Sequence, residues 1–215
     1  MIANEKIIWI TIELLRKALF NHPILLPNID TEAWKLVYVF SVNHGVATFC
    51  FDAIETLPSD KLPPKSLLLK WALYVDKVEK LYNNHQEALY KLQQLLKPYN
   101  VKILQLKGLS LSKMYPRPNH RECGDIDFYE VGSSGKVDKI LESFGFKVDY
   151  RSKRHSKFDY EGVPFENHRY FLHGQKDAEN VEIEDFLQQE ALFASKNTND
   201  TIFTFEIKGG WLFFF

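Results

Sequence analysis

The chain has 215 residues, of which 45% are hydrophobic and 26% charged, and its formal net charge is −1. This composition indicates a globular protein and excludes a largely disordered one. The near balance of 27 basic and 28 acidic residues also excludes the strongly basic surface of proteins held to nucleic acid by charge, without excluding a nucleic-acid substrate. Cys50 and Cys123 lie far apart, and the apolar run near the N-terminus is too short for a signal peptide or membrane span. We therefore expect a cytoplasmic protein without a disulfide.

The first hundred residues have the apolar spacing of helices. One helix is expected over about residues 6–19, and a second runs from a cap at Asp30 or Thr31 to a stop at Gly45. Residues 46–56 are less regular. A long pattern then begins after the Pro63-Pro64 pair and ends before Pro98, which corresponds to a helix of roughly 45 Å. We therefore expect a helical N-terminal region over residues 1–98.

The pattern changes to short strands at Val101. Strands are expected at "VKILQL", "DIDFYEV" and "FKVDY", followed by a hairpin around a Glu161-Gly162 turn. A short helix should follow the first strand, and another should bury Val137, Ile140, Leu141 and Phe144. The expected fold class is therefore α+β, with a small mixed sheet and flanking helices over residues 99–215. The apolar ending "IKGGWLFFF" is expected to be either a buried final strand or the end of a truncated or frame-shifted chain.

The strand "DIDFYEV" carries an unusual pair of carboxylates. Side chains alternate in a strand, so Ile126 and Phe128 anchor one face while Asp125 and Asp127 share the other. Two such carboxylates repel by about a few kcal/mol at an effective dielectric near 20, which favours a bound cation between them. Oxygen ligands alone suit Mg²⁺ or Mn²⁺. The competing interpretation is a solvated pair on an open sheet face.

Two neighbouring segments favour a site. In "QLKGLSLSK", Gly108 lies between a strand and a helix, where backbone N–H groups, Lys107, Ser110 and Ser112 could meet an anion. In the predicted hairpin, Glu166 and His168 share a face and could add a third carboxylate to the aspartates. The rivals for that third carboxylate are Glu182 and Glu184 of "VEIEDF", which alternate with Val181 and Ile183. A zinc site at His120 and Cys123 is disfavoured, since no second pair has ligand spacing.

Together these motifs resemble the nucleotidyltransferase fold of the DNA polymerase beta superfamily, and more narrowly its bacterial group of uncharacterised nucleotidyltransferases. The resemblance is good over residues 101–172 and looser in the helical region. The shared pattern consists, in order, of Lys107-Gly108, Tyr115-Pro116, Arg121, Gly124-Asp125-Ile126-Asp127 and Glu166-Asn167-His168.

The resemblance implies transfer of a nucleoside monophosphate from an NTP, with ATP expected, to an acceptor hydroxyl, with release of pyrophosphate and with Mg²⁺ or Mn²⁺ as cofactor. The acceptor could be a small molecule, an RNA or a protein; no membrane is implied, and the oligomeric state stays open. The implied catalytic and metal-binding residues are Asp125, Asp127 and Glu166. The implied nucleotide-binding residues are Lys107, Gly108, Ser110 and Arg121. The alternatives are a catalytically inactive nucleotide-binding or protein-interaction module on the same fold, and a metal-dependent phosphohydrolase.

Overall fold

The computed structural model describes residues 2–132, 135–172 and 178–204, so the apolar ending "IKGGWLFFF" lies outside the described residues. The chain forms two compact units. The first comprises Met1–Asn83 with Ser112–Glu122, and the second comprises Asn84–Leu111 with Cys123–Phe215. The expected α+β class is confirmed, because helices dominate the first unit and a five-stranded mixed sheet forms the second. Within the described residues, no helix combines the length and apolar character that a membrane span requires.

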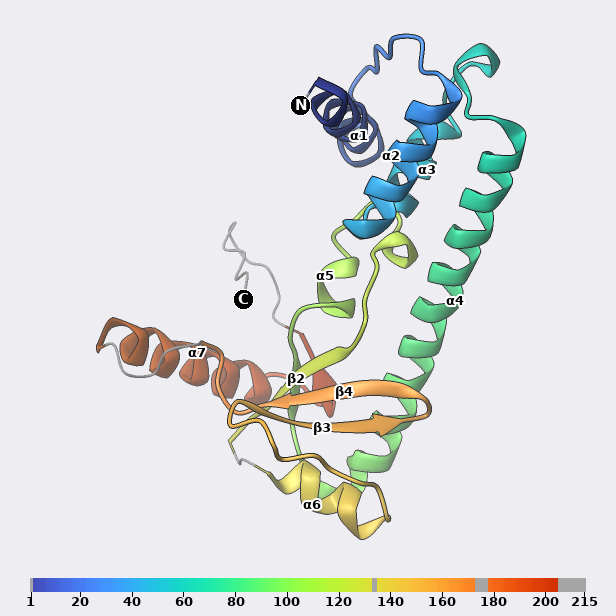
Figure 1. Ribbon diagram of the computed structural model, residues 1–215. Coiled ribbons are helices and arrows are strands. Elements are labelled where there is room, and N and C mark those ends of the chain that lie inside the picture. Colours follow the sequence, from blue (N-terminus) through green and yellow to red (C-terminus); the bar gives the residue numbers. More distant parts are fainter. Residues whose placement is uncertain (1, 133–134, 173–177, 205–215) are drawn as a thin grey trace. The chain divides into compact units, whose positions relative to one another are not determined.

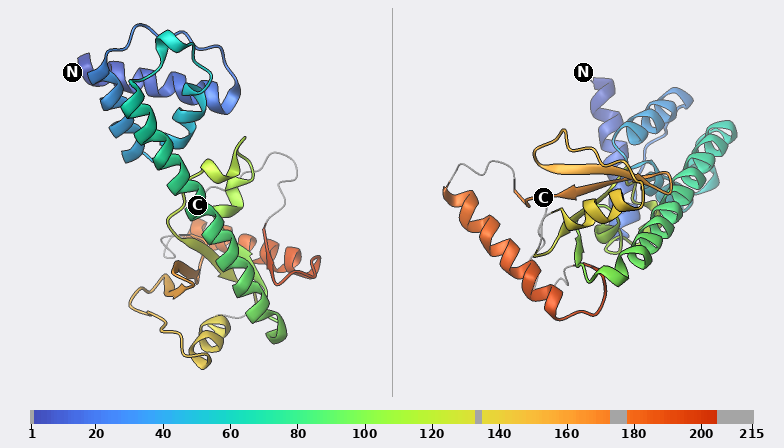
Figure 2. Two further views of the ribbon diagram at one scale, coloured as in Figure 1. Left: turned by 90° about the vertical axis from the view of Figure 1, so that its right-hand side faces the viewer. Right: turned by 90° about the horizontal axis from the view of Figure 1, so that it is seen from below.

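The first unit is a helical bundle in which α1, α2 and α3 gather around the first half of α4 (Figures 1 and 2). Its core centres on Trp34 and Trp71, whose rings meet edge to face with centroids 6.5 Å apart. Asp30, one of the two caps that the sequence offered, caps α2 by accepting the backbone N–H of Ala33 at 2.8 Å. The helices are α1 (Ile2–Phe20), α2 (Thr31–Asn43), α3 (Ala47–Ile54), the short η1 (Ser59–Lys61) and α4 (Lys65–Leu96).

The segment from Ser112 to Glu122 is fastened to this bundle by a buried histidine. His120, at the end of η3 (Pro118–His120), lies 3.0 Å from Asp52 Oδ2 through Nδ1 and 2.9 Å from Glu79 Oε1 through Nε2. Burial alone would lower the pKa of His120, but the hydrogen bonds to the two carboxylates outweigh burial and raise that pKa above its usual value. Both ring nitrogens of His120 are thus engaged in holding this segment to the bundle.

The second unit is built on a sheet with strand order β3-β4-β2-β1-β5. Strand β2 pairs antiparallel with β1 and parallel with β4, while β3 and β4 form the expected antiparallel hairpin. The strands are β1 (Ile103–Gln105), β2 (Ile126–Glu130), β3 (His155–Tyr160), β4 (Val163–His168) and β5 (Ile202–Phe203). The helical elements of this unit, besides the second half of α4, are η2 (Lys97–Tyr99), α5 (Leu109–Ser112, whose last residue is assigned to the first unit), α6 (Lys136–Ser143) and α7 (Ala178–Lys196).

The sheet is buried on both faces over its central strands. Helix α7 packs through Leu187 and Ala191 on the face that carries Leu104. The opposite face carries Ile103, Phe128 and other buried residues, and the second half of α4 flanks the sheet from the side away from α7 (Figures 1 and 2). The end of β2 that carries the aspartates is thus anchored by a packed apolar layer.

Three predictions from the sequence are wrong in this unit. Residues 146–150 do not form a strand; they contribute one isolated bridge, between Asp149 and Lys157. Phe144 follows α6 and is 53% exposed, because Gly145 at a φ of +86° turns the chain away before another helical turn can form. The segment "VEIEDF" belongs to α7, where Glu182 and Glu184 do not alternate as strand residues would.

Candidate active site

Three carboxylates converge where β2 and β4 lie side by side. The parallel register pairs Asp127 with Glu166, and Asp125 immediately precedes β2. Asp125, Asp127 and Glu166 each offer an oxygen atom, and these atoms all lie within 4.8 Å of one another. Asp127 and Glu166 are buried, while Asp125 is half-buried. The strand pairing therefore brings together the three acidic residues that the sequence singled out.

The carboxylates perturb one another's protonation. Burial raises the pKa of Asp125 above its usual value, and the charges of Asp127 and Glu166 raise it further. Burial also pushes the pKa of Asp127 upward, but a hydrogen bond from His168 and the charge of Lys107 outweigh burial and lower that pKa. Asp125 is thus the more basic of the two aspartates, and negative charge accumulates at this point of the sheet.

Basic side chains border the cluster. Lys107 Nζ lies 3.3 Å from Asp127 Oδ1, and Lys157 on β3 forms an ion pair with Glu166 Oε1. His168 Nε2 donates a hydrogen bond to Asp127 Oδ1 at 2.8 Å. Both lysine side chains are about half exposed, so each ammonium group can move into solvent at little cost when another cation or a phosphate enters.

The glycine turn after β1 lies against the start of β2. Gly108 has a φ of +73°, and a Cβ built on it would lie 3.5 Å from the backbone oxygen of Asp125. The positive φ is the reason for glycine at this position, because other L-residues pay about 1–2 kcal/mol there. Ser110 Oγ lies 3.5 Å from the carbonyl oxygen of Lys107 within the same turn. Lys107 and Gly108 therefore border the carboxylate cluster, and Ser110 belongs to the same turn.

The other sequence candidates belong to other elements of the chain. Arg121 belongs to the helical unit, where its guanidinium carbon is 5.9 Å from the centroid of the Tyr115 ring. Glu182 is exposed on α7. Glu184 is buried, and its carboxylate accepts the backbone N–H groups of Phe171 and Leu172. Its oxygens are engaged in holding the backbone beyond β4, which is a structural task.

Two residues at the site were not singled out from the sequence. Lys157 pairs with Glu166 across the hairpin, and His155 pairs with His168. Counting back from the Glu161-Gly162 turn would have found both, because a two-residue turn fixes the register of the strands it joins. Both turn residues have positive φ values, of 56° and 75°, as such turns require.

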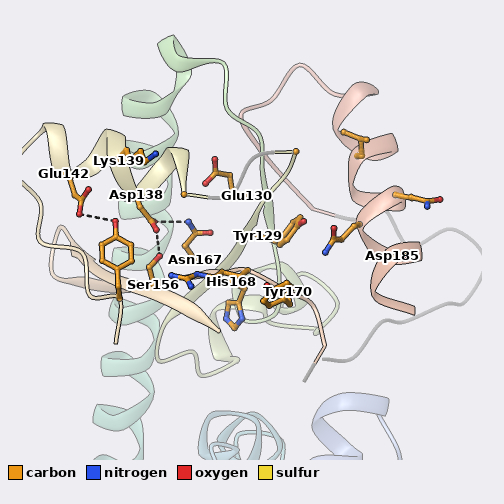
Figure 3. A pocket seen from close by; sticks show the side chains of 17 residues that line it. Tyr129, Glu130, Asp138, Lys139, Glu142, Ser156, Asn167, His168, Tyr170 and Asp185 are labelled. Atoms are coloured by element: carbon orange, nitrogen blue, oxygen red, sulfur yellow. Dashed lines mark hydrogen bonds between the residues drawn. The ribbon is translucent and has the colours of Figure 1, made fainter. Parts of the chain in front are cut away.

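A large open pocket includes His168 but none of the three carboxylates in its lining, which Figure 3 shows. Its volume is about 1140 Å³, and side chains from β2, β4, α6 and α7 line it. Tyr129, Tyr170 and His168 lie close together in the pocket (Figure 3). The carboxylate of Asp138 accepts hydrogen bonds from Ser156 at 2.7 Å and from Asn167 at 2.9 Å. His168 contacts Asp127 and also lines the pocket, so this side chain connects the pocket with the carboxylate cluster.

Comparison with known proteins gives one result. A family model described as "Uncharacterised nucleotidyltransferase" matches residues 30–200. Comparisons with curated proteins and with solved structures found no match. The family match spans most of the chain and includes all the residues of the candidate site, so the resemblance inferred from the motifs is confirmed. The chain belongs to the family of uncharacterised nucleotidyltransferases.

Proposed function

We propose that the protein transfers a nucleoside monophosphate from an NTP, ATP being the first to test, to an acceptor hydroxyl and releases pyrophosphate. The observation that carries the proposal is the register of β2 and β4, which sets Asp127 beside Glu166 with Asp125 within ligand range of both. The membership in a nucleotidyltransferase family supports the same reaction. In phosphoryl transfer the protein contributes mainly positioning and neutralisation of charge.

The donor set fits Mg²⁺ or Mn²⁺. Asp125, Asp127 and Glu166 offer oxygen ligands only, which is the preference of these cations. The pKa of Asp125 is raised by burial and by the charges of Asp127 and Glu166, which a bound cation would offset. When bound, one or two such cations would neutralise the triphosphate and the charge that develops during transfer.

The phosphates are assigned to the glycine turn. Lys107, within 3.3 Å of Asp127, can pair with the β- and γ-phosphates by a short movement of its half-exposed side chain. Gly108 lets the backbone approach the ligand without a Cβ, and the Ser110 hydroxyl adds a donor. Arg121 stays a candidate for a phosphate contact or for bracing its own loop, where it approaches the Tyr115 ring.

The reaction balances with groups of this unit. The acceptor oxygen forms a bond to the α-phosphorus while the bond from that phosphorus to the β-bridging oxygen breaks, and pyrophosphate leaves with the electron pair. The hydroxyl proton passes to a carboxylate of the cluster.

The acceptor is assigned to the pocket beside His168. Its lining offers Tyr129, Tyr170 and Gln188, which suit a ligand with hydroxyl groups and a flat or apolar part. Tyr129 lies across from His168 in the sheet, so an acceptor on this side would reach the carboxylates along β2 and β4. The chemical class of the acceptor is the question that a labelling experiment can answer.

The experiment has two stages. Calorimetry with NTPs and Mg²⁺ or Mn²⁺ tests binding, and absence of binding by the wild type would refute the proposal. Incubation with α-labelled NTP and cell extract then tests transfer. We expect labelled acceptor with the wild type and with Glu182→Gln, a surface control on α7, but none with Asp127→Asn or Glu166→Gln. Equal labelling by wild type and Asp127→Asn would contradict the assigned role of Asp127.

One observation favours a catalytically inactive nucleotide-binding module as the second candidate. Lys107, Lys157 and His168 already neutralise or hydrogen-bond the carboxylates from within the chain. A module of this kind would bind NTP but leave no label on an acceptor. Release of free phosphate without an adduct would instead indicate a phosphohydrolase.

A further inference from the structure

The β3–β4 hairpin places two histidines around the third carboxylate. His155 on β3 lies opposite His168 on β4, and their ring centroids are 5.3 Å apart. Glu166 precedes His168 by two residues, so the three side chains lie on one face of the hairpin. One ligand atom from each of the three residues lies within 4.8 Å of the others. The carboxylate cluster thus continues into a group with nitrogen ligands.

The distances within this group are those of metal ligands. Glu166 Oε2 lies 3.5 Å from His155 Nδ1 and 3.5 Å from His168 Nε2. Both separations exceed ordinary N–H···O hydrogen bonds, which end near about 3.2 Å. Ligands about 2.0–2.1 Å from a tetrahedral metal are about 3.4 Å apart. Two of the three separations therefore match those of ligands on one tetrahedral metal, and one atom from each residue lies within 4.8 Å of the others.

Of the three ligand atoms, His168 Nε2 has a closer contact, with Asp127. Lys157 engages Oε1 of Glu166, so that Oε2 is the oxygen that faces the two rings. His168 Nε2 now donates to Asp127, and ligation would require the tautomer with its proton on Nδ1. The three side chains are 11–17% exposed, so a further ligand can approach from solvent.

The chemistry of the donors selects the cation. Two imidazoles and one carboxylate bind Zn²⁺ and related transition metals, whereas Mg²⁺ prefers oxygen ligands throughout. We propose that His155, Glu166 and His168 form a second metal site that binds Zn²⁺ or Co²⁺ in preference to Mg²⁺. It shares Glu166 with the oxygen-only position at Asp125 and Asp127. Ligation of His168 would also free Asp127 from its hydrogen bond, which couples the two positions.

The binding claim stands on these three side chains alone, while any effect of the second metal on transfer rests on the proposed function. The probes are Co²⁺, whose visible absorption reports a site of low coordination number, and Zn²⁺ in competition with a chromophoric chelator. Both are used on the full chain after removal of metals with EDTA. We expect one Co²⁺ with a visible band, displaced by Zn²⁺ and not by excess Mg²⁺.

Variants make the test specific. His155→Gln and His168→Gln should each weaken Zn²⁺ binding at least about tenfold. Mutation of a residue that only hydrogen-bonds a metal ligand already lowers metal affinity by about that factor. His22→Gln, which changes an exposed histidine of the helical unit, should bind Zn²⁺ as the wild type does. Thermal unfolding of the metal-free variants verifies their folding, and Glu166→Gln replaces any variant that unfolds.

The outcomes separate this inference from the proposed function. Asp125→Asn should retain the Co²⁺ band even though it impairs transfer, and a wild type that binds Co²⁺ without any transfer would leave the second site intact. Absence of the band in the wild type, or wild-type Zn²⁺ affinity in both histidine variants, would overturn the inference.

Discussion

Replacing Glu184 by glutamine should destabilise the sheet unit without affecting the candidate active site. Glu184 is 6% exposed, and its carboxylate accepts the N–H of Phe171 at 2.9 and 3.1 Å and that of Leu172 at 2.9 Å. Gln188 Nε2 adds a hydrogen bond of 2.7 Å. Hydrogen bonds to a charged group contribute about 1.5–3 kcal/mol each. Glutamine keeps one acceptor oxygen and loses the charge, so we expect a loss of about 2–3 kcal/mol.

The loss can be measured as a shift of the melting temperature. For a chain of this size about 1 kcal/mol corresponds to about 2–4 °C, so Glu184→Gln should melt about 4–12 °C below the wild type. Hydrogen exchange at residues 170–172 should accelerate in the same variant. The matched control is Glu182→Gln, whose exposed side chain should leave the melting temperature unchanged. At temperatures below its melting range, Glu184→Gln should bind NTP and metal with the affinity of the wild type.

The opposite pattern would refute the assignment of Glu184. If Glu184→Gln melted with the wild type and lost metal binding while Glu166→Gln retained it, then Glu184 and not Glu166 would be the third carboxylate. The expected loss of stability depends on the hydrogen bonds from Phe171 and Leu172 to Glu184. An unchanged hydrogen-exchange rate at residues 170–172 in Glu184→Gln would contradict those hydrogen bonds.

Three further outcomes are expected. Gly108→Ala should cost about 1–2 kcal/mol of stability, because alanine is strained at a φ of +73°, and should weaken NTP binding; denaturant unfolding and calorimetry measure these two effects. The pKa of His120 is raised in the folded protein, so protonated His120 stabilises the fold. This contribution is fully present below about pH 6.5 and is lost as the pH rises through the folded-state pKa. The melting-temperature gap between wild type and His120→Gln should therefore narrow from acidic to alkaline pH, and a constant gap would contradict this linkage. Lys157→Met should increase affinity for divalent metal several-fold in a Co²⁺ or Mn²⁺ titration, because the ammonium group competes for Glu166; unchanged affinity would mean that the ion pair does not compete.

The parts of the site that follow strict local rules could be predicted from the sequence. Because side chains alternate along β2, Asp127 was predicted to lie on the face of the sheet that faces away from the buried Phe128. The two-residue turn predicted the hairpin that carries Glu166. The cap at Asp30 was also predictable, because an aspartate before an apolar-periodic run is a common helix start. These features depend on residues only a few positions apart.

The parts that depend on distant contacts could not be read with the same accuracy. Residues 181–186 alternate as a strand would, but tertiary packing of Leu187 against the sheet and the bonds of Glu184 fix them in a helix. Likewise, Phe146 and Val148 suit a strand by composition, yet the edge of β3 accepts only the single bridge at Asp149. Pairing in a sheet requires a partner strand, and the sequence does not reveal which edges are available.

The hairpin turn at Glu161-Gly162 has a consequence for the order in which the protein folds. His155, Glu166 and His168 lie on strands joined by two residues, so they can meet as soon as one local loop closes. Asp127 joins them only through the parallel pairing of β2 with β4, which encloses α6 and β3 and is slow to form. We therefore expect the nitrogen-bearing half of the site to form during folding before Glu166 meets the two aspartates.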